Sequence, residues 1–283
     1  MSKRRDIEGH IRSLGEISDI MGAMKNLAVM ETQKVTRLLS AQERVVSSMH
    51  AAGTDFLTFY PEVFPRVEEG RLLLLVIGSE RGFCGEYNDK LLAHVEERLR
   101  VARDKEPVLF TVGRKLAARM SDKRTVAVSI EGASVAEEVQ SVMIQVMDHV
   151  HQLQRQDTSG RPLTITVVSH VSESAGVNTQ ILRPFETSPG QTTRFKGSPL
   201  LNLPPHVFLA ELVDLYLFSL LHKIFYSALL AENRARVSHL EGAIQRLKKE
   251  ASELERKRNM LRQEEITQEI ELLMLSAERL RQQ

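Results

Sequence analysis

The feature that most constrains this chain is a long stretch without proline at each end, patterned as a helix. From Pro205 to Gln283 there is no further proline and a single glycine, Gly242. A continuous helix over that stretch would be roughly 115 Å long at about 1.5 Å per residue. Such a helix cannot bury its apolar stripe against a compact domain of ordinary size. It therefore needs a partner helix, and the N-terminal stretch is the obvious candidate.

Both terminal stretches carry a heptad period. In the N-terminal stretch, one apolar series recurs every seven residues: Ile7, Leu14, Met21, Ala28 and Val35. A second series lies three positions after the later members of this heptad pattern: Ile17, Met24, Leu38 and Val45. His10, Glu31 and Gln42 interrupt the pattern. The last stretch alternates steps of four and three, then resumes after a phase shift: Leu240, Ile244, Leu247, Ala251, Leu254 and Leu261, then Ile266, Ile270, Leu273, Ala277 and Leu280. The pattern predicts an antiparallel coiled coil made from the two ends of one chain. The alternative is two amphipathic helices of an ordinary bundle.

Composition narrows the class of protein. The 38 basic and 37 acidic side chains nearly cancel, which argues against nucleic-acid or membrane-surface binding driven by bulk charge. Cys84 is the single cysteine, so an intramolecular disulfide is impossible and a reducing compartment is expected. The apolar stretch around 215–230 has Asp214 at its start and contains His222 and Lys223, which makes it too polar for a typical membrane span.

The middle of the chain alternates as a parallel α/β sheet does. We expect five strands and two helices, at Leu72–Ile77, Val108–Val112, Thr125–Ile130, Leu163–His170 and Gln180–Phe185, and at 88–103 and 133–154. This order indicates right-handed crossovers and a small doubly wound, Rossmann-like sheet. Residues 188–205 have the composition of a linker. The predicted division is a coiled-coil helix over 1–60, an α/β domain with its linker over 61–204, and a coiled-coil helix over 205–283.

A glycine-rich loop, Gly78-Ser-Glu-Arg-Gly-Phe-Cys-Gly85, follows the first predicted strand, where α/β sheets present ligands. It lacks the Lys-Ser or Lys-Thr of a phosphate-binding loop, and its glycine spacing is not that of a dinucleotide site. Close chain packing is the favoured interpretation, although Cys84 could in principle be a nucleophile at a helix N-terminus. No spacing typical of a metal site occurs. We therefore expect no cofactor, no metal and no catalytic residue.

Four segments in order resemble the gamma subunit of F-type ATP synthases. Near the N-terminus, Ala23-Met-Lys25 and Lys34 are similar to the family's Lys-Ala-Met segment, and 78–88 is similar to its Arg-Gly-Leu-Cys-Gly-Gly-Leu-Asn loop. Later, Glu232 and Ala235-Arg236 resemble its Glu-x-x-Ala-Arg-Met helix, and 262–270 resembles its Ala-Arg-Gln-x-x-Ile-Thr-Gln-Glu-Ile ending. The charged run 236–246 and Phe218, Leu272 and Ser276 depart from the family pattern. They indicate a divergent member, such as one from an alternative ATPase operon.

The resemblance implies a non-catalytic rotor shaft that couples ion flow to ATP synthesis or hydrolysis. It would lie peripherally on the cytoplasmic side of a bacterial inner membrane. Its implied partners are the alpha and beta subunits of the catalytic hexamer, the epsilon subunit and the membrane c-ring. By the same resemblance, Met24, Arg262, Gln263 and Thr267 match positions that contact the beta subunit. Positions near the foot, the ring and epsilon are matched by four more residues: Arg81, Cys84, Asn88 and Tyr216.

Two other classes of function remain open on the residues alone. One is a coiled-coil tether or scaffold with an inserted α/β domain. The other is a small α/β enzyme with helical dimerisation arms, which would require a reactive Cys84.

Overall fold

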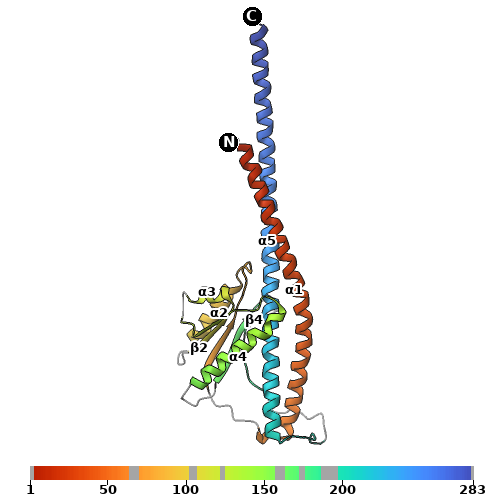
Figure 1. The fold of residues 1–283 in the computed structure, drawn as a ribbon, viewed down its shortest axis with the longest axis vertical. Coiled ribbons are helices and arrows are strands. Elements are labelled where there is room, and N and C mark those ends of the chain that lie inside the picture. Colours follow the sequence, from red (N-terminus) through yellow and green to blue (C-terminus); the bar gives the residue numbers. More distant parts are fainter. Residues whose placement is uncertain are drawn as a thin grey trace. The chain divides into compact units, whose positions relative to one another are not determined.

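The computed structural model describes residues 3–63, 70–101, 107–121, 125–156, 163–171, 176–185 and 197–281. They form two compact units, one from Met1–Leu27 with Val237–Gln283 and one from Ala28–Arg236. The two terminal helices, α1 (Lys3–Phe59) and α5 (Pro205–Arg281), contribute residues to both units (Figure 1). No proline interrupts either helix beyond the first residue of α5, where proline is tolerated because its missing N–H has no intrahelical partner.

The unit Ala28–Arg236 contains a five-stranded sheet of order β3-β2-β1-β4-β5. The strands are β1 (Arg71–Ile77), β2 (Val108–Val112), β3 (Val128–Ile130), β4 (Leu163–His170) and β5 (Val177–Ile181). The first four are parallel, with Leu75 of β1 opposite Phe110 and Val167, whereas β5 runs antiparallel to β4. The doubly wound α/β fold predicted from the sequence is confirmed.

The fifth strand lies earlier than predicted. It occupies 177–181 instead of 180–185, because the N–H of Val171 donates to the carbonyl of Gly176 at 3.0 Å and β5 pairs with β4 from the next residue onward. Phe185 lies beyond the strand with a positive φ of 37° and is buried. Alternation alone could not locate this edge strand, since its side chains are only partly buried.

Helices cover both faces of the sheet. On one face lie α2 (Tyr87–Val101) and α3 (Arg114–Ser121), whose Leu91 and Leu116 pack against alternate strand residues such as Leu74. On the other lies α4 (Val139–Gln156), preceded by the short 3-10 helix Ala136–Glu138. The sequence analysis missed α3, which buries only Leu116 and Met120. It also began α4 too early, since residues 133–135 are not helical.

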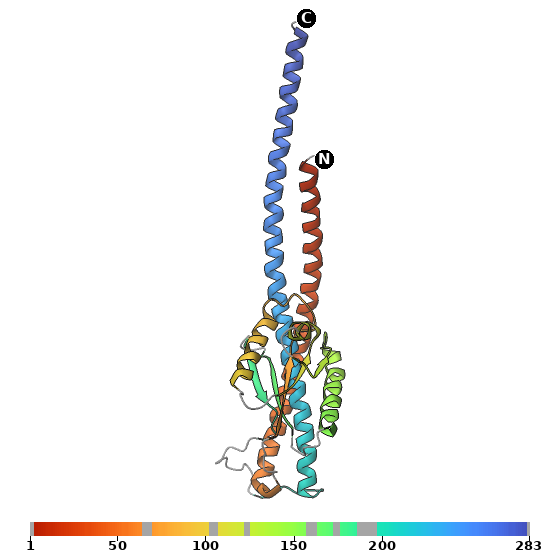
Figure 2. The same ribbon diagram turned by 90° about the vertical axis from the view of Figure 1, so that its left-hand side faces the viewer.

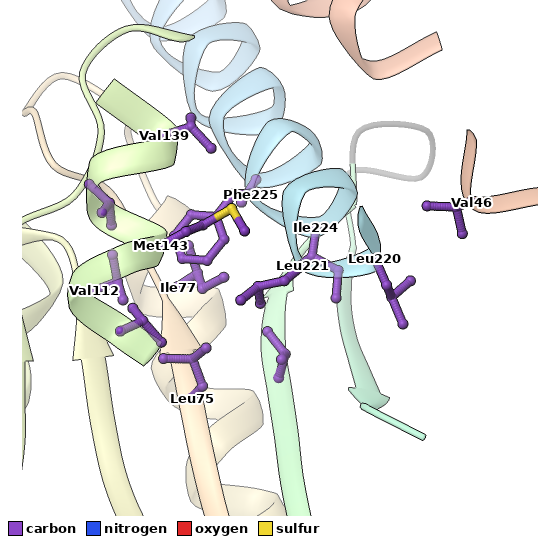
Figure 3. Packing of buried hydrophobic residues seen from close by; sticks show 14 of the residues in the cluster. Val46, Leu75, Ile77, Val112, Val139, Met143, Leu220, Leu221, Ile224 and Phe225 are labelled. Atoms are coloured by element: carbon purple, nitrogen blue, oxygen red, sulfur yellow. The ribbon is translucent and has the colours of Figure 1, made fainter. Parts of the chain in front are cut away.

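The larger hydrophobic core lies between the α4 face of the sheet and α5 (Figure 3). Ile77 and Val112 project from the strands, Met143 and Val139 from α4, and Phe225 with its neighbours from α5. All of these side chains are nearly inaccessible to solvent. Most of the apolar stretch around 215–230 is thus buried in this core, whereas Leu215 and Phe218 are exposed.

The unit Met1–Leu27 with Val237–Gln283 is an antiparallel helix pair (Figure 2). Lys25 pairs with Glu241 at 2.5 Å, His10 lies 3.9 Å from Glu250, and Arg4 lies 3.5 Å from Glu265. Leu14, Leu240 and Ile244 are buried. The antiparallel pairing of the two ends of the chain agrees with the sequence prediction.

The second heptad series of α1 was misplaced by one residue. Leu14, Ala28 and Val35 are buried as predicted, but Leu39 and Val46 are buried in place of Leu38 and Val45, and Ser18 is less exposed than Ile17. The buried face therefore follows positions four residues after the first series, instead of three. The sequence could not separate these positions because apolar residues stand on both sides of the true face. The misplaced residues form an exposed apolar edge.

Candidate functional site

The glycine-rich loop 78–85 leaves the carboxyl end of β1 and is fixed by its own neighbours. A side chain at Gly78 would bring its Cβ within 2.5 Å of the Cβ of Leu116, so only glycine fits. The amide of Asn88 completes the turn, because its oxygen accepts from the N–H of Ser79 at 3.0 Å and its nitrogen donates to the Ser79 hydroxyl at 2.8 Å. Asn88 and Ser79 are both buried.

Cys84 lies inside this loop as a protonated thiol. Its Sγ donates towards the carbonyl oxygens of Gly82 at 3.4 Å and Arg81 at 3.6 Å. Burial, together with the Glu232 carboxylate, raises the pKa of Cys84 to about 12. Such a thiol has almost no nucleophilic thiolate at neutral pH. This contradicts the requirement of the small-enzyme alternative for a reactive Cys84.

Glu80 fills the position where a doubly wound sheet would hold an anionic ligand. Its carboxylate accepts from the N–H of Arg114, at the start of α3, at 3.0 Å and from the N–H of Gly132 at 2.7 Å. It also pairs with the Arg114 guanidinium, and its side chain is only 2% exposed. Burial by itself raises the pKa of Glu80, but these N–H groups and the guanidinium outweigh it and lower that pKa below its usual value.

Glu232 of α5 binds the same loop from the opposite side. Its carboxylate accepts from the N–H groups of Glu80 at 3.3 Å and Arg81 at 3.2 Å. Arg236, one turn further along α5, pairs with Glu232 and donates to the carbonyl of Gly82 at 3.2 Å and to the side chain of Asn233 at 2.8 Å. We call Glu232, Arg236 and loop 78–85 the latch.

The charged side chains of the latch, Glu232 and Arg236, are buried and hydrogen-bonded. Glu232 is 4% and Arg236 5% exposed. Burial raises the pKa of Glu232, opposed by Arg236 and by the N–H groups of the loop. Removing a buried charge from its partner is costly, because the remaining charge has no water to replace it. The latch therefore fixes the glycine-rich loop to α5.

Tyr87 at the start of α2 adds a second contact to α5. Its hydroxyl donates to the carbonyl of Ala228 at 3.1 Å, and its ring stacks on His170 with centroids 4.0 Å apart. The ring nitrogen Nε2 of His170 lies 2.8 Å from the carbonyl of Tyr87. Burial lowers the pKa of His170, which keeps the imidazole neutral and able to donate to that carbonyl.

The loop before α4 is attached to α1 by two acidic residues. The carboxylate of Glu31 accepts from the N–H of Ala136 at 2.6 Å, and Lys34 pairs with Glu137. Glu31 was identified in the sequence only as an interruption of the heptad. The carboxyl edge of the sheet, where a ligand would bind, is thus occupied by contacts to both terminal helices.

Three of the predicted foot residues lie together, but the fourth does not. Arg81 and Cys84 belong to the glycine-rich loop, and Asn88 at the start of α2 bonds to Ser79 of that loop. Arg81 also donates from Nε to the Ser134 hydroxyl at 3.0 Å. Tyr216 lies on α5 about 24 Å before Glu232, at about 1.5 Å per residue. There it packs against Phe185, with ring centroids 4.7 Å apart.

The predicted beta-subunit contacts lie in the helix pair of the other unit. Met24 is half-buried on α1, whereas Arg262, Gln263 and Thr267 are exposed on α5. The Thr267 hydroxyl donates to the main-chain carbonyl of Gln263 at 2.9 Å, one turn earlier in α5. Met24 continues an exposed apolar stripe of α1 formed by Ile17, Ile20 and Leu27 at 47, 62 and 63% exposure.

The distal part of α5 exposes further apolar side chains. Large hydrophobic residues from 260 to 274 are roughly half to two-thirds exposed: Met260, Ile266, Ile270, Leu272, Leu273 and Met274. The seam predicted after the phase shift is therefore not buried by α1 at its described positions. The distal part of α5 therefore carries an exposed apolar surface.

The sequence missed Glu80, Tyr87 and His170 as functional residues of this site. Glu80 carried the one available signal, an acidic side chain in a glycine-rich turn directly after a buried strand. Within the part of the chain that the structure describes, no group of acidic, histidine or cysteine side chains is arranged to hold a metal ion. Within the same residues, no helix has both the length and the hydropathy needed to cross a membrane.

Comparisons with known proteins give a consistent family. A family model described as ATP synthase matches residues 3–280. The chain is 36% identical over 143 residues to the ATP synthase gamma chain of Mycolicibacterium smegmatis, covering 46% of this chain and 45% of that one. It is 26% identical to the gamma chain of Mycobacterium ulcerans over an alignment of 304 residues that covers 94% of each. The match to the first relative thus spans less than half of that relative's length.

Two solved structures share the fold. The rotor of the Euglena gracilis mitochondrial ATP synthase matches with a TM-score of 0.61 at 15% identity, covering 93% of this chain and 98% of that one. The central stalk with c-ring of the Tetrahymena thermophila mitochondrial enzyme matches with a TM-score of 0.54 at 19% identity, covering 79% and 99%.

Proposed function

We propose a function from the premise that this chain belongs to the ATP synthase family, with gamma chains as its relatives. We infer that it is the central-stalk, or rotor-shaft, subunit of an F-type ATP synthase. In that role it couples ion flow through the membrane ring to ATP synthesis or hydrolysis in the hexamer of alpha and beta subunits.

The observation that carries this proposal is the helix pair of the unit Met1–Leu27 with Val237–Gln283. Its two helices run antiparallel, yet Ile17 and Ile20 of α1 and Ile266 of α5 remain exposed. A helix pair that leaves apolar side chains on its outside fits inside a surrounding partner. A shaft that turns within a hexamer would have such a surface, because subunits contact it on all sides.

The chain acts without catalysing the reaction itself, and the ATP chemistry belongs to the beta subunits. The state of the glycine-rich loop supports this division. Glu80 occupies the anion position of the sheet, and Cys84, with a pKa of about 12, is unsuited to nucleophilic attack. The loop therefore binds α5, and not a substrate.

The beta subunit is contacted by Met24, Arg262, Gln263 and Thr267. The exposed guanidinium and amide of Arg262 and Gln263 can donate hydrogen bonds to carboxylate or carbonyl oxygens of a facing loop. Met24 offers a flexible apolar side chain at the edge of the exposed stripe of α1. Contacts of this mixed kind can form and break as the shaft turns.

Arg81, Cys84, Asn88 and Tyr216 mark the side of the chain near the foot, the ring and the epsilon subunit. Cys84, Asn88 and Tyr216 are all less than a tenth exposed, so their contribution is to hold the surface in shape. Partners would touch exposed neighbours, such as Phe83 in the loop and Phe218 on α5, which are 49 and 44% exposed. Within the complex, this chain lies peripherally on the cytoplasmic face of a bacterial inner membrane.

Co-expression with the alpha and beta subunits of the same source tests the proposal. Native mass spectrometry should find three alpha, three beta and one copy of this chain, and ATP hydrolysis should depend on its presence. A matched version truncated after residue 258, which removes Arg262, Gln263 and Thr267, should retain the helix pair but reduce hydrolysis. Failure to form a complex, or full ATP hydrolysis without the chain, would contradict the proposal and favour a coiled-coil tether instead.

A further inference from the structure

A cavity of about 610 Å³ lies in the unit Ala28–Arg236, where α1 ends and α5 begins. One wall is a single face of α1, formed by Ala52, Asp55, Phe56 and Phe59 at helical spacing. Phe208 of α5 and the segment 197–201 form the remaining walls. The volume falls within the range of about 300–1,000 Å³ that small-molecule sites occupy. None of its lining residues belongs to the latch.

The inner wall of this cavity is aromatic. The rings of Phe56 and Phe208 have centroids 4.9 Å apart at an angle of 45°, and Phe56 is only 3% exposed, which holds it in place. Phe59, one turn further along α1, is half-buried beside them. Tyr60 stacks on Phe56 with ring centroids 4.9 Å apart, so the half-buried ring of Phe59 is the one that can offer its face. An aromatic face carries negative electrostatic potential and attracts a cation that approaches within about 6 Å.

Asp55 adds a carboxylate to the same wall. It is half-buried, and within the described parts of the chain its side chain makes no hydrogen bond or ion pair. The described lining contains no lysine, arginine or histidine to neutralise it. A carboxylate without a basic partner repels anions and attracts a cation. The aromatic rings beside it favour a cation that also carries an apolar group.

We propose that this cavity binds an alkylammonium ligand. The ammonium lies against the Asp55 carboxylate and the half-buried ring of Phe59, and the alkyl chain packs along Pro199 and Leu201. The same chemistry is offered by the amine headgroup of a membrane phospholipid and by a free amphiphilic amine. The site is separate from the shaft surfaces and does not depend on the proposed function.

Calorimetric titration of the full chain with three probes of equal tail length tests the site. Dodecyltrimethylammonium, below its micelle concentration, should bind at one site, whereas dodecyl sulfate and dodecyl maltoside should bind at least about tenfold more weakly. Asp55→Asn should weaken binding of the cation about tenfold and leave the maltoside unchanged. Asp148→Asn, which removes an exposed carboxylate on α4, is the matched control and should change neither.

A second variant isolates the aromatic contribution. Phe59→Leu keeps apolar bulk but removes one ring, and it should weaken binding of the cation about threefold, the effect of an exposed cation–π contact. Thermal unfolding of each variant verifies that it is folded. Equal binding of the three probes, absence of a saturable site, or an unchanged affinity in Asp55→Asn overturns the proposal.

Vesicles distinguish the two sources of the ligand. Co-sedimentation with vesicles of phosphatidylethanolamine, lost in Asp55→Asn and absent with phosphatidylglycerol, supports the site with a lipid headgroup as its ligand. Binding of dodecyltrimethylammonium without co-sedimentation supports the same site with a soluble amine. Co-sedimentation that is stronger with phosphatidylglycerol contradicts the charge on which the site rests.

Discussion

The latch and the terminal helix pair use ion pairs in opposite ways. In the latch, Glu232 and Arg236 are about 5% exposed, and each makes further hydrogen bonds to the backbone of loop 78–85. In the helix pair, the side chains of Lys25 and Glu241 are 26 and 48% exposed. The buried ion pair is held in one geometry, because any other geometry would leave a charge without solvent or a partner. In an exposed ion pair, each charge can instead be solvated by water, so the pair breaks easily. One region fixes structure, and the other leaves its surface open to partners.

The largest expected effect concerns the thiol inside the latch. With a pKa of about 12, Cys84 should have a thiolate fraction at pH 8 on the order of a thousandfold below that of an unfolded cysteine. Alkylation by iodoacetamide, followed by mass spectrometry, should be correspondingly slow in the native chain and fast in urea. As a control, Ser13→Cys on exposed α1 should react at the rate of a free thiol. Equal rates at the two positions would show that the latch is open.

Removing the carboxylate of the latch should have the next largest effect. Glu232→Ala leaves the buried Arg236 without its partner and two loop N–H groups without an acceptor, so the free energy of unfolding should fall by about 3–5 kcal/mol. Urea denaturation measures this loss. The matched change in the helix pair, Glu241→Ala, should cost less than about 1 kcal/mol. Similar losses for both variants would remove the contrast between the two regions.

Glu80 should make the stability of the unit Ala28–Arg236 depend on pH in the acid range. Its pKa is lowered in the folded chain, so its contribution to stability is present above the ordinary value of 4.5 and is lost as the pH falls through the folded pKa. Glu80→Gln should lower stability by about 1.5–3 kcal/mol at pH 7. The difference from the unmodified chain should shrink as the pH falls below 4.5 in denaturation curves recorded at stepped pH. A difference that is constant with pH would contradict this role.

The smallest expected change in stability is at the helix pair, where the effect on function should be larger. Met24→Lys places a charge at a half-buried edge position and should cost no more than about 1 kcal/mol. Within the assembled complex it should lower ATP-driven ion pumping relative to ATP hydrolysis. Asn26→Lys adds the same charge on the opposite, exposed face and should leave pumping intact. Normal pumping with Met24→Lys would count against a contact with the beta subunit.

The positions of the first two strands and the pairing of the terminal helices were predictable because they depend on strong apolar patterns. Leu72–Ile77 is a continuous apolar run and Val108–Val112 is apolar apart from Thr111, and β1 and β2 lie there. The seam of α1 was predicted less well, since Ile17 and Ser18 each fit a helical stripe and only the partner determines which is buried. Short α3, with two buried residues, gave too weak a pattern to identify.

The candidate site was less predictable than the fold, because its bonds join residues far apart in the chain. Glu232 binds the N–H of Glu80 across 152 positions, and Glu31 binds that of Ala136 across 105. No local spacing encodes such pairs. Glu232 and Arg236 entered the sequence analysis only through a family resemblance. Their burial and their loop partners became visible only with the structure.

The single cysteine of this chain has a practical consequence for fluorescence experiments. Because Cys84 is buried and held as a thiol, it is a silent background for maleimide dyes. One cysteine introduced at an exposed position, such as Ser13, would carry the only fluorophore without prior removal of the native residue. A dye placed there would follow the orientation of α1 in single-molecule recordings while every contact around the glycine-rich loop stays unaltered.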